Sequence, residues 1–147
     1  MGRGRGVVTG EFRLREHTAD VAVEARGDTP DDAFAAVGDG LAAAMCDAED
    51  VPDGGERFDL SVVAESREAA LFDYLGELIY ERDVRGVLPV DNEVRVSETD
   101  GEWRVTASAR GVPLSAVPAR DVKAVTYSEM RLDRTDDGWA VYVVFDV

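Results

Sequence analysis

The chain has 147 residues, enough for one domain around a single hydrophobic core. Its 31 acidic residues outnumber 16 basic ones, giving a formal net charge of −15. Such an acidic domain is a poor nucleic-acid binder, because affinity for nucleic acids comes mainly from Lys and Arg contacts to phosphate. We therefore expect it to act on RNA only through a basic partner protein.

The rest of the composition excludes several other classes. One cysteine, Cys46, allows no intrachain disulfide, and no Cys/His cluster has zinc-binding spacing. No apolar run approaches the roughly 20 residues that span a membrane, and the N-terminus lacks the apolar core of a signal peptide. We therefore expect a cytoplasmic protein without a membrane partner.

The basic residues are almost all arginine, and Lys123 is the only lysine. An acidic excess with little lysine is typical of proteins adapted to concentrated salt, where a Debye length of about 3 Å screens self-repulsion. On this interpretation the source is halophilic and most carboxylates are solvated surface groups. A lysine retained in such a chain is more informative than usual.

The first part of the chain predicts an arm and two strands. Residues 1–10 are rich in glycine and arginine and predict a disordered arm, so the domain is expected to occupy residues 11–147. Residues 11–16 alternate Phe12 and Leu14 with charged neighbours, and residues 20–27 place Val21, Val23 and Ala25 on one face. Both segments are predicted strands.

Two amphipathic helices are predicted next. Thr29 as N-cap and Pro30 at the first helical position predict a helix beginning at residue 30, in which Gly38 and Gly40 indicate close packing against a neighbour. Ser66 caps a second predicted helix that extends to about residue 83. A strand is predicted over residues 57–65, between the helices.

Four more extended segments follow, at residues 92–98, 102–110, 119–134 and 139–147, and the third is predicted to bend near Ser128. Turns such as "TDG" and "TDDG" favour antiparallel hairpins. The predicted fold is α+β: a single-domain, two-layer sandwich of about seven mostly antiparallel strands with two amphipathic helices.

The last strand is apolar on both faces, which predicts a central, well-covered strand. It ends in Asp146 and Val147, so the Asp146 side chain and the terminal carboxylate of Val147 are held close together. A hard cation such as Ca²⁺, Mg²⁺ or Mn²⁺ would relieve their repulsion, since these ions take oxygen ligands. The alternative is that both acids simply face solvent.

Three further residues are candidates for a site. Lys123 lies among apolar neighbours and either pairs with an anionic group or extends to water. The segment "EHTADVAVEA" carries His17, the only histidine, and Asp20. Either they form a site, or Asp20 caps local backbone N–H groups and His17 is a half-buried ring. The sequence offers no specific Ser/His/Asp or Cys/His pattern for nucleophilic catalysis.

Several segments, in this order, resemble the archease family: "EHTADVAVEARGDTPDDAFAAVGDGLAAAM", "LFDYLGELIYERD", "VKAVTYSEM" and the ending "VVFDV". The resemblance covers the chain from about Phe12 onward. It implies a non-enzymatic protein cofactor of the RtcB-type tRNA ligase, which joins RNA ends in tRNA splicing through a guanylated histidine of its own. Family members promote ligase guanylation and multiple turnover, and some are linked to a tRNA methyltransferase.

The resemblance also assigns residues. It implies a divalent metal ion held by Asp20, Asp146 and Val147, with Lys123 matching the lysine of the KAVTY motif and His17 supporting the loop that carries Asp20. The family often has histidine where this chain has Ser128, so the role of that position stays open.

Two other classes of function stay open. A metal-dependent enzyme acting on a phosphate ester would use His17 as acid/base and turn over alone. A general chaperone, or a modulator of a tRNA methyltransferase, would bind without depending on Asp146.

Overall fold

The computed structural model describes residues 10–16 and 20–147. Within them the order of elements is β1 (Gly10–Glu16), β2 (Asp20–Gly27), α1 (Pro30–Met45), β3 (Glu56–Ala64), α2 (Arg67–Arg85), β4 (Val87–Thr99), β5 (Glu102–Pro113), β6 (Ala124–Thr135) and β7 (Gly138–Asp146), with short 3-10 helices after α1 and β5. Gly10 already belongs to β1, and the rest of the predicted arm lies outside the described residues.

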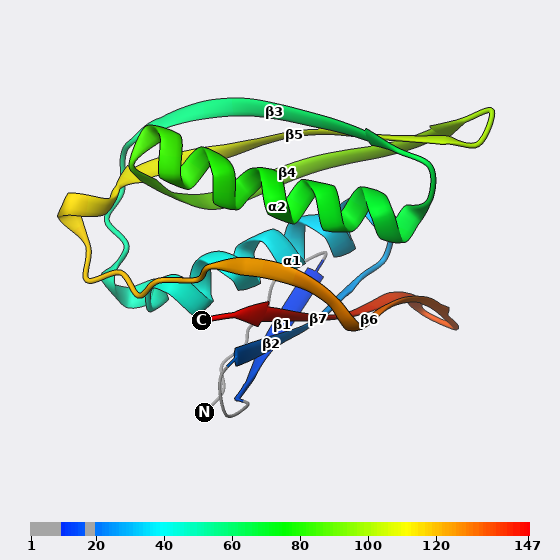
Figure 1. The fold of residues 1–147 in the computed structure, drawn as a ribbon, viewed down its shortest axis with the longest axis horizontal. Helices are drawn as coiled ribbons and strands as arrows, with labels where there is room; N and C mark the ends of the chain where they lie inside the picture. The colour runs from blue at the N-terminus through cyan, green and yellow to red at the C-terminus, as the bar shows by residue number, and fades with distance from the viewer. Residues whose placement is uncertain (1–9, 17–19) are drawn as a thin grey trace.

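The strands form two antiparallel sheets, one ordered β1-β2-β7-β6 and the other β3-β5-β4. We call them the β7 sheet and the β5 sheet. Both helices lie between them, with the β5 sheet along the top of Figure 1 and the β7 sheet along the bottom. The predicted α+β class, with its antiparallel strands and two amphipathic helices, is confirmed.

α1 begins where its sequence predicts. The Thr29 hydroxyl accepts a hydrogen bond from the Asp32 N–H at 3.1 Å, and Pro30 occupies the first helical position. A Cβ atom on Gly38 would lie 2.5 Å from the Tyr74 hydroxyl, and one on Gly40 would lie 2.5 Å from Val23. The predicted close packing of both glycines is therefore confirmed.

α2 is capped at both ends. The Ser66 hydroxyl accepts from the Ala69 N–H at 3.1 Å, and the helix ends at Gly86, whose φ of 67° is the left-handed conformation that glycine adopts without strain. Its core stripe packs inward and consists of Leu71, Leu75, Leu78 and Ile79. This face closes the core between the two sheets.

β7 lies between β2 and β6, so the prediction of a central last strand is confirmed. One of its faces enters the core with Val141, Val143 and Phe145. Its neighbour β6 shifts register between Thr126 and Arg131, and Glu129 has a φ of 62°. This bulge is the predicted bend near Ser128.

Cys46, directly after α1, is 1% exposed and belongs to the core. Among the helices of the described residues, none combines the length and hydropathy needed to cross a membrane.

Candidate functional site

The register of the β7 sheet places Asp20 directly opposite Asp146. Opposite residues of an antiparallel pair point to the same face, with Cα atoms about 4.5–5.5 Å apart. The adjacent pair, Val21 and Phe145, points into the core, and Phe145 is 0% exposed. Asp20 and Asp146 therefore lie side by side on the outer face of the sheet.

Lys123 joins this pair through its backbone. Its N–H donates to the Asp146 carbonyl at 2.8 Å, which extends the β6 ladder by one residue. Alternation along the strand places Ala124 on the outer face with Asp146, and Lys123 on the other side with Val125. The lysine and the two carboxylates thus meet at one end of the sheet, from opposite faces.

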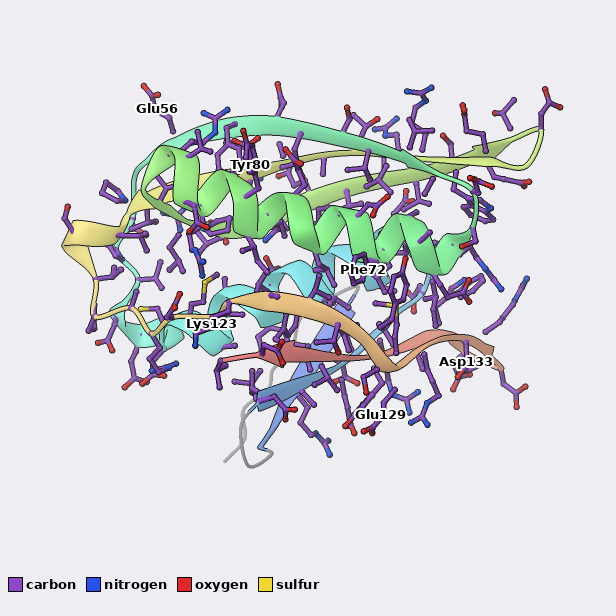
Figure 2. The ribbon with its side chains drawn as sticks, viewed as in Figure 1. Glu56, Phe72, Tyr80, Lys123, Glu129 and Asp133 are labelled. Carbon is purple, nitrogen blue, oxygen red and sulfur yellow. The ribbon has the colours of Figure 1, made fainter. Side chains whose placement is uncertain are left out.

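The side chain of Lys123 is exposed at the start of β6 (Figure 2), and it forms no ion pair with the side chains described in residues 11–14 and 20–147. Val147, the next residue after Asp146, is 48% exposed. Ser128 is exposed in the β6 bulge, and His17 lies outside the described residues. The structure therefore brings together Asp20, Asp146, Val147 and the Lys123 backbone.

Arg82 holds the segment that leads to Lys123, a role that the sequence did not reveal. Arg82 is only 7% exposed, and its guanidinium donates to the Val122 carbonyl at 2.7 Å. It also forms ion pairs with Asp83 at 2.9 Å and Asp121 at 3.6 Å. Position 82 continues the three- and four-residue spacing of the α2 core stripe, and that spacing is the signal that could have revealed it.

Arg120 anchors the same segment to the end of α1, which has no basic residue in its own last turn. Its Nε donates to the Ala44 carbonyl at 3.1 Å, and Nη2 donates to the Ala43 carbonyl at 3.2 Å. The backbone N–H of Arg120 donates to the Met45 carbonyl at 2.6 Å. A cation at the carbonyl end of a helix is favourable, so the contact stabilises both α1 and the segment before Lys123.

The donors at this end of the sheet suit a hard cation. Two like charges directly opposite each other destabilise a sheet, and carboxylate oxygens are the ligands that Mg²⁺, Ca²⁺ and Mn²⁺ prefer. Across the described part of the chain, no three His, Cys, Asp or Glu side chains gather closely enough to hold a metal ion. Asp20 and Asp146 fit the ion if the Val147 terminal carboxylate or another group completes the ligand set.

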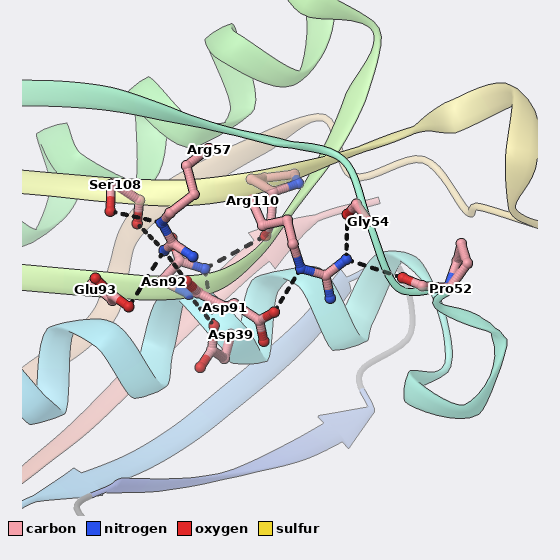
Figure 3. Close-up of polar contacts among 10 residues, drawn as sticks. Asp39, Pro52, Gly54, Arg57, Asp91, Asn92, Glu93, Ser108 and Arg110 are labelled. Atoms are coloured by element: carbon pink, nitrogen blue, oxygen red, sulfur yellow. Dashed lines mark hydrogen bonds and ion pairs between the residues drawn. The ribbon is translucent and has the colours of Figure 1, made fainter.

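A second polar cluster lies inside the fold and joins α1, α2 and β4, and Figure 3 shows its Asp39 and Asn92 side chains. The Tyr74 hydroxyl donates to Asn92 Oδ1 at 2.8 Å. Asn92 donates to Asp39 Oδ1 from its backbone N–H at 2.9 Å and from Nδ2 at 3.0 Å. Burial raises the pKa of Asp39, and the hydrogen bonds from Asn92 oppose this effect. The cluster satisfies its buried groups internally, which indicates a structural role.

Neighbouring arginines tie the β5 sheet to the loop before β3. Arg110 pairs with Asp91 at 2.7 Å and donates to the Gly54 carbonyl at 2.6 Å, while Arg57 donates to the Ser108 hydroxyl at 3.1 Å (Figure 3). Asp91 occupies a bulge of β4 with a φ of 51°. The bulge presents Asp91 to Arg110, so these contacts have a structural explanation.

The fold and the site define a small acidic α+β protein with a half-buried and an exposed carboxylate, Asp20 and Asp146, paired at one end of a sheet next to a lysine. A model of the archease protein family matches residues 12–147, and the chain belongs to this family. The protein archease of Pyrococcus furiosus is 33% identical over 136 residues, covering 90% of this chain and 95% of the relative. That of Thermococcus gammatolerans is 37% identical over 136 residues, with the same coverage of 90% and 95%.

Solved structures agree with the family. The solution structure of Methanobacterium thermoautotrophicum protein 1598 matches with a TM-score of 0.80 at 25% identity, covering 92% of this chain and 98% of that one. A Thermotoga maritima crystal structure, described as an archease and possible chaperone, matches with a TM-score of 0.58 at 22% identity over 100% of both chains. The second likeness shows the shared fold.

Proposed function

We propose that this protein is a non-enzymatic activator of an RtcB-type RNA ligase in tRNA splicing, one that promotes ligase guanylation and multiple turnover. The observation that carries the proposal is the direct opposition of Asp20 and Asp146 on the outer face of the β7 sheet, with the Lys123 N–H bonded to Asp146. The resemblance of the HTAD, KAVTY and terminal segments assigns these same residues to the family's site.

A divalent ion, Ca²⁺, Mg²⁺ or Mn²⁺, is part of the proposal. Asp20, Asp146 and the terminal group of Val147 would hold it, and it would supply positive charge for a partner's phosphate or carboxylate oxygens. The paired strands hold the backbones of both aspartates in place, so little backbone entropy is lost on binding. Lys123 would offer a second cationic group from the adjoining side of β6.

An activator of this kind needs no nucleophile. It acts in trans by binding one state of its partner more tightly than another, and it shifts the partner's equilibrium by that difference in affinity. A rigid strand end that carries charge suits such a role, because its groups are held in place before the partner arrives. Arg82 and Arg120 maintain this rigidity around residues 117–123.

The test is ligase guanylation and multiple-turnover ligation with the cognate ligase and substoichiometric amounts of this protein. We expect Asp20→Ala, Asp146→Ala and Lys123→Ala each to abolish most of the stimulation, while Glu102→Ala, at an exposed hairpin position, retains it. Folding of each variant is checked by its melting temperature. Full stimulation by the folded Asp146→Ala variant would refute the proposal.

A second candidate is a general chaperone or a modulator of a tRNA methyltransferase. It is favoured by the description of the Thermotoga maritima protein of the same fold as a possible chaperone. The dose distinguishes the two, because an activator raises ligase turnover at substoichiometric amounts, whereas a chaperone that holds its client acts stoichiometrically. Phosphoester turnover by the protein alone would instead indicate an enzyme.

A further inference from the structure

An aromatic pair on the surface, formed by Phe72 of α2 and Tyr127 of β6, has no internal explanation. The two rings are stacked, with centroids 3.9 Å apart and an interplanar angle of 6°. Tyr127 is nevertheless 52% exposed. Because Phe72 covers one face of the Tyr127 ring, we assign the exposed area to the opposite face, the ring edge and the hydroxyl.

The other partly exposed rings on the β strands show what such a face binds in this protein. Arg67 lies 4.8 Å from the Trp139 ring centroid and 6.0 Å from that of Trp103, and Arg131 lies 5.3 Å from that of Tyr142. Guanidinium groups stack on aromatic faces through cation–π attraction and planar packing. Among the described residues, no arginine or lysine occupies the Phe72–Tyr127 pair.

Asp73 directly follows Phe72 in α2, and its carboxylate is near enough to act on Tyr127. Partial burial first, and the neighbouring Asp73 carboxylate second, raise the pKa of Tyr127. Asp73 is exposed and forms no ion pair within the described part of the chain. An open ring face next to an unpaired carboxylate matches a guanidinium, which can stack on the ring and donate hydrogen bonds to the acid.

The pair also lies near the proposed site. β6 runs alongside α2, and Figure 2 shows Phe72 and Tyr80 on the helix and Lys123 at the start of the strand. Lys123 directly precedes β6 and lies on the same side as Val125, and Tyr127 is four residues further on, so the two side chains start within about 13 Å of each other along the chain. One partner segment can therefore contact both.

We infer that Phe72, Tyr127 and Asp73 form a receptor for an arginine side chain presented by a protein partner. Identifying that partner as the RtcB-type ligase rests on the proposed function, whereas the arginine chemistry rests on this surface alone. The receptor would increase affinity for the partner without taking part in activation.

The first experiment uses a peptide and is independent of the ligase. Acetyl-Gly-Arg-Gly-Arg-Gly-amide and its lysine counterpart are titrated against the protein while the ring signals of Phe72 and Tyr127 are followed by NMR. We expect the arginine peptide to bind at least about threefold more tightly, and Tyr127→Ser and Asp73→Asn to weaken it by about fivefold or more. Tyr80→Ser is the matched control, since it removes a 57% exposed tyrosine ring from α2, the helix that carries Phe72.

Three results would overturn the receptor: equal affinity for the two peptides, equal losses in Tyr80→Ser and Tyr127→Ser, or tighter binding of a uridine oligonucleotide to the same rings. The last would indicate a nucleic-acid ligand instead. The melting temperature of Tyr127→Ser verifies that its effect is not unfolding.

The second experiment measures binding to the ligase. We expect Tyr127→Ser to raise the dissociation constant for the ligase about tenfold but to retain full stimulation at saturating protein. Asp146→Ala should bind the ligase as tightly as the wild type but lose the stimulation. If the wild type binds in a Tyr127-dependent way without stimulating, the proposed function fails and the receptor stands. Stimulation with unchanged Tyr127→Ser binding refutes the receptor alone, and absence of ligase binding refutes the ligase as its occupant.

Discussion

At the scale of single residues, Asp39 departs from the rule that acids in this chain are solvated. It lies between Gly38 and Gly40 of α1, and its Oδ1 accepts both N–H donors of Asn92. The sequence places an acid inside a helical pattern, but it does not show that Asn92, far along the chain, will face it. Burial of a carboxylate is costly, and the two hydrogen bonds offset part of that cost.

We predict that Asp39→Asn flattens the pH dependence of stability. Because the folded-state pKa of Asp39 is raised above 3.8, the native state binds a proton more tightly than the unfolded state does. Its contribution to stability is therefore greatest at low pH and is lost as pH rises through the folded pKa. The unfolding free energy of Asp39→Asn relative to that of the wild type, measured in urea from about pH 4 to 7.5, should therefore increase as pH rises.

Asp39→Ala is the control, because it removes the acceptor as well as the charge. Two N–H groups of Asn92 would then lack a partner, at a cost of about 1–3 kcal/mol. If Asp39→Asn lost as much stability as Asp39→Ala at every pH, the charge would have no part in the effect.

At the scale of elements, two helix glycines should respond oppositely to the same substitution. Alanine favours a helix by about 1 kcal/mol over glycine. At Gly76 of α2 a Cβ would meet only Val125 at 4.0 Å, so Gly76→Ala should raise stability by about that amount. At Gly38 it would lie 2.5 Å from the Tyr74 hydroxyl and 2.9 Å from Asn92, so Gly38→Ala should cost about 1–3 kcal/mol despite the helix preference.

Denaturation in urea checks both glycine variants, and each serves as the control for the other. Equal shifts in the same direction would mean that helix propensity alone decides, and that the polar cluster of Tyr74 and Asn92 can move aside without cost.

A further element-scale prediction concerns the link between α2 and the segment before Lys123. Arg82→Met keeps an apolar stem but removes the donor to the Val122 carbonyl, and a hydrogen bond from a charged group contributes about 1.5–3 kcal/mol. We expect a loss of that size in unfolding free energy. Arg85→Met, which breaks the more exposed pair with Glu81, should cost less than about 1 kcal/mol. Similar losses would show that the Val122 contact is not special.

Local signals predicted most of the elements. Helix caps at Thr29 and Ser66, apolar spacing and turn dipeptides depend on neighbours in sequence, so both helices and most strands could be anticipated. The start of β4 could not, because Pro89 and the bulge at Asp91 interrupt the alternation expected of a strand. Sheet order also escaped prediction, since it depends on contacts between distant segments.

At the scale of the whole molecule, the charge of −15 makes a prediction about salt. Self-repulsion among the carboxylates opposes the compact state, and ions screen it. We expect the melting temperature to rise with KCl, mostly between about 0.1 and 1 M, over which the Debye length shortens from about 10 to 3 Å. A matched series in sorbitol controls for solute exclusion, and an equal rise there would argue against screening.

The candidate site was predictable as residue types but not as a geometry. The motifs singled out Asp20, Lys123 and Asp146 because their chemistry is unusual in this composition. Only the register of β2 on β7 places the two aspartates opposite each other, and it also places Lys123 on the other side of the sheet. The apolar spacing of α2 reaches position 82 and could have marked Arg82 as inward-facing, but nothing in the sequence indicates that Arg82 and Arg120 donate to the carbonyls of Val122 and Ala44.

The pairing of β2 with β7 has a consequence for folding. Asp20 and Asp146 stand near opposite ends of the described chain, so their pairing is among the most nonlocal contacts of the fold, and such contacts form slowly. The two helices and the β5 sheet can assemble from segments that lie closer together in sequence. The carboxylate pair therefore exists only in molecules whose β7 sheet has closed, and a partner that recognises it selects the fully folded protein.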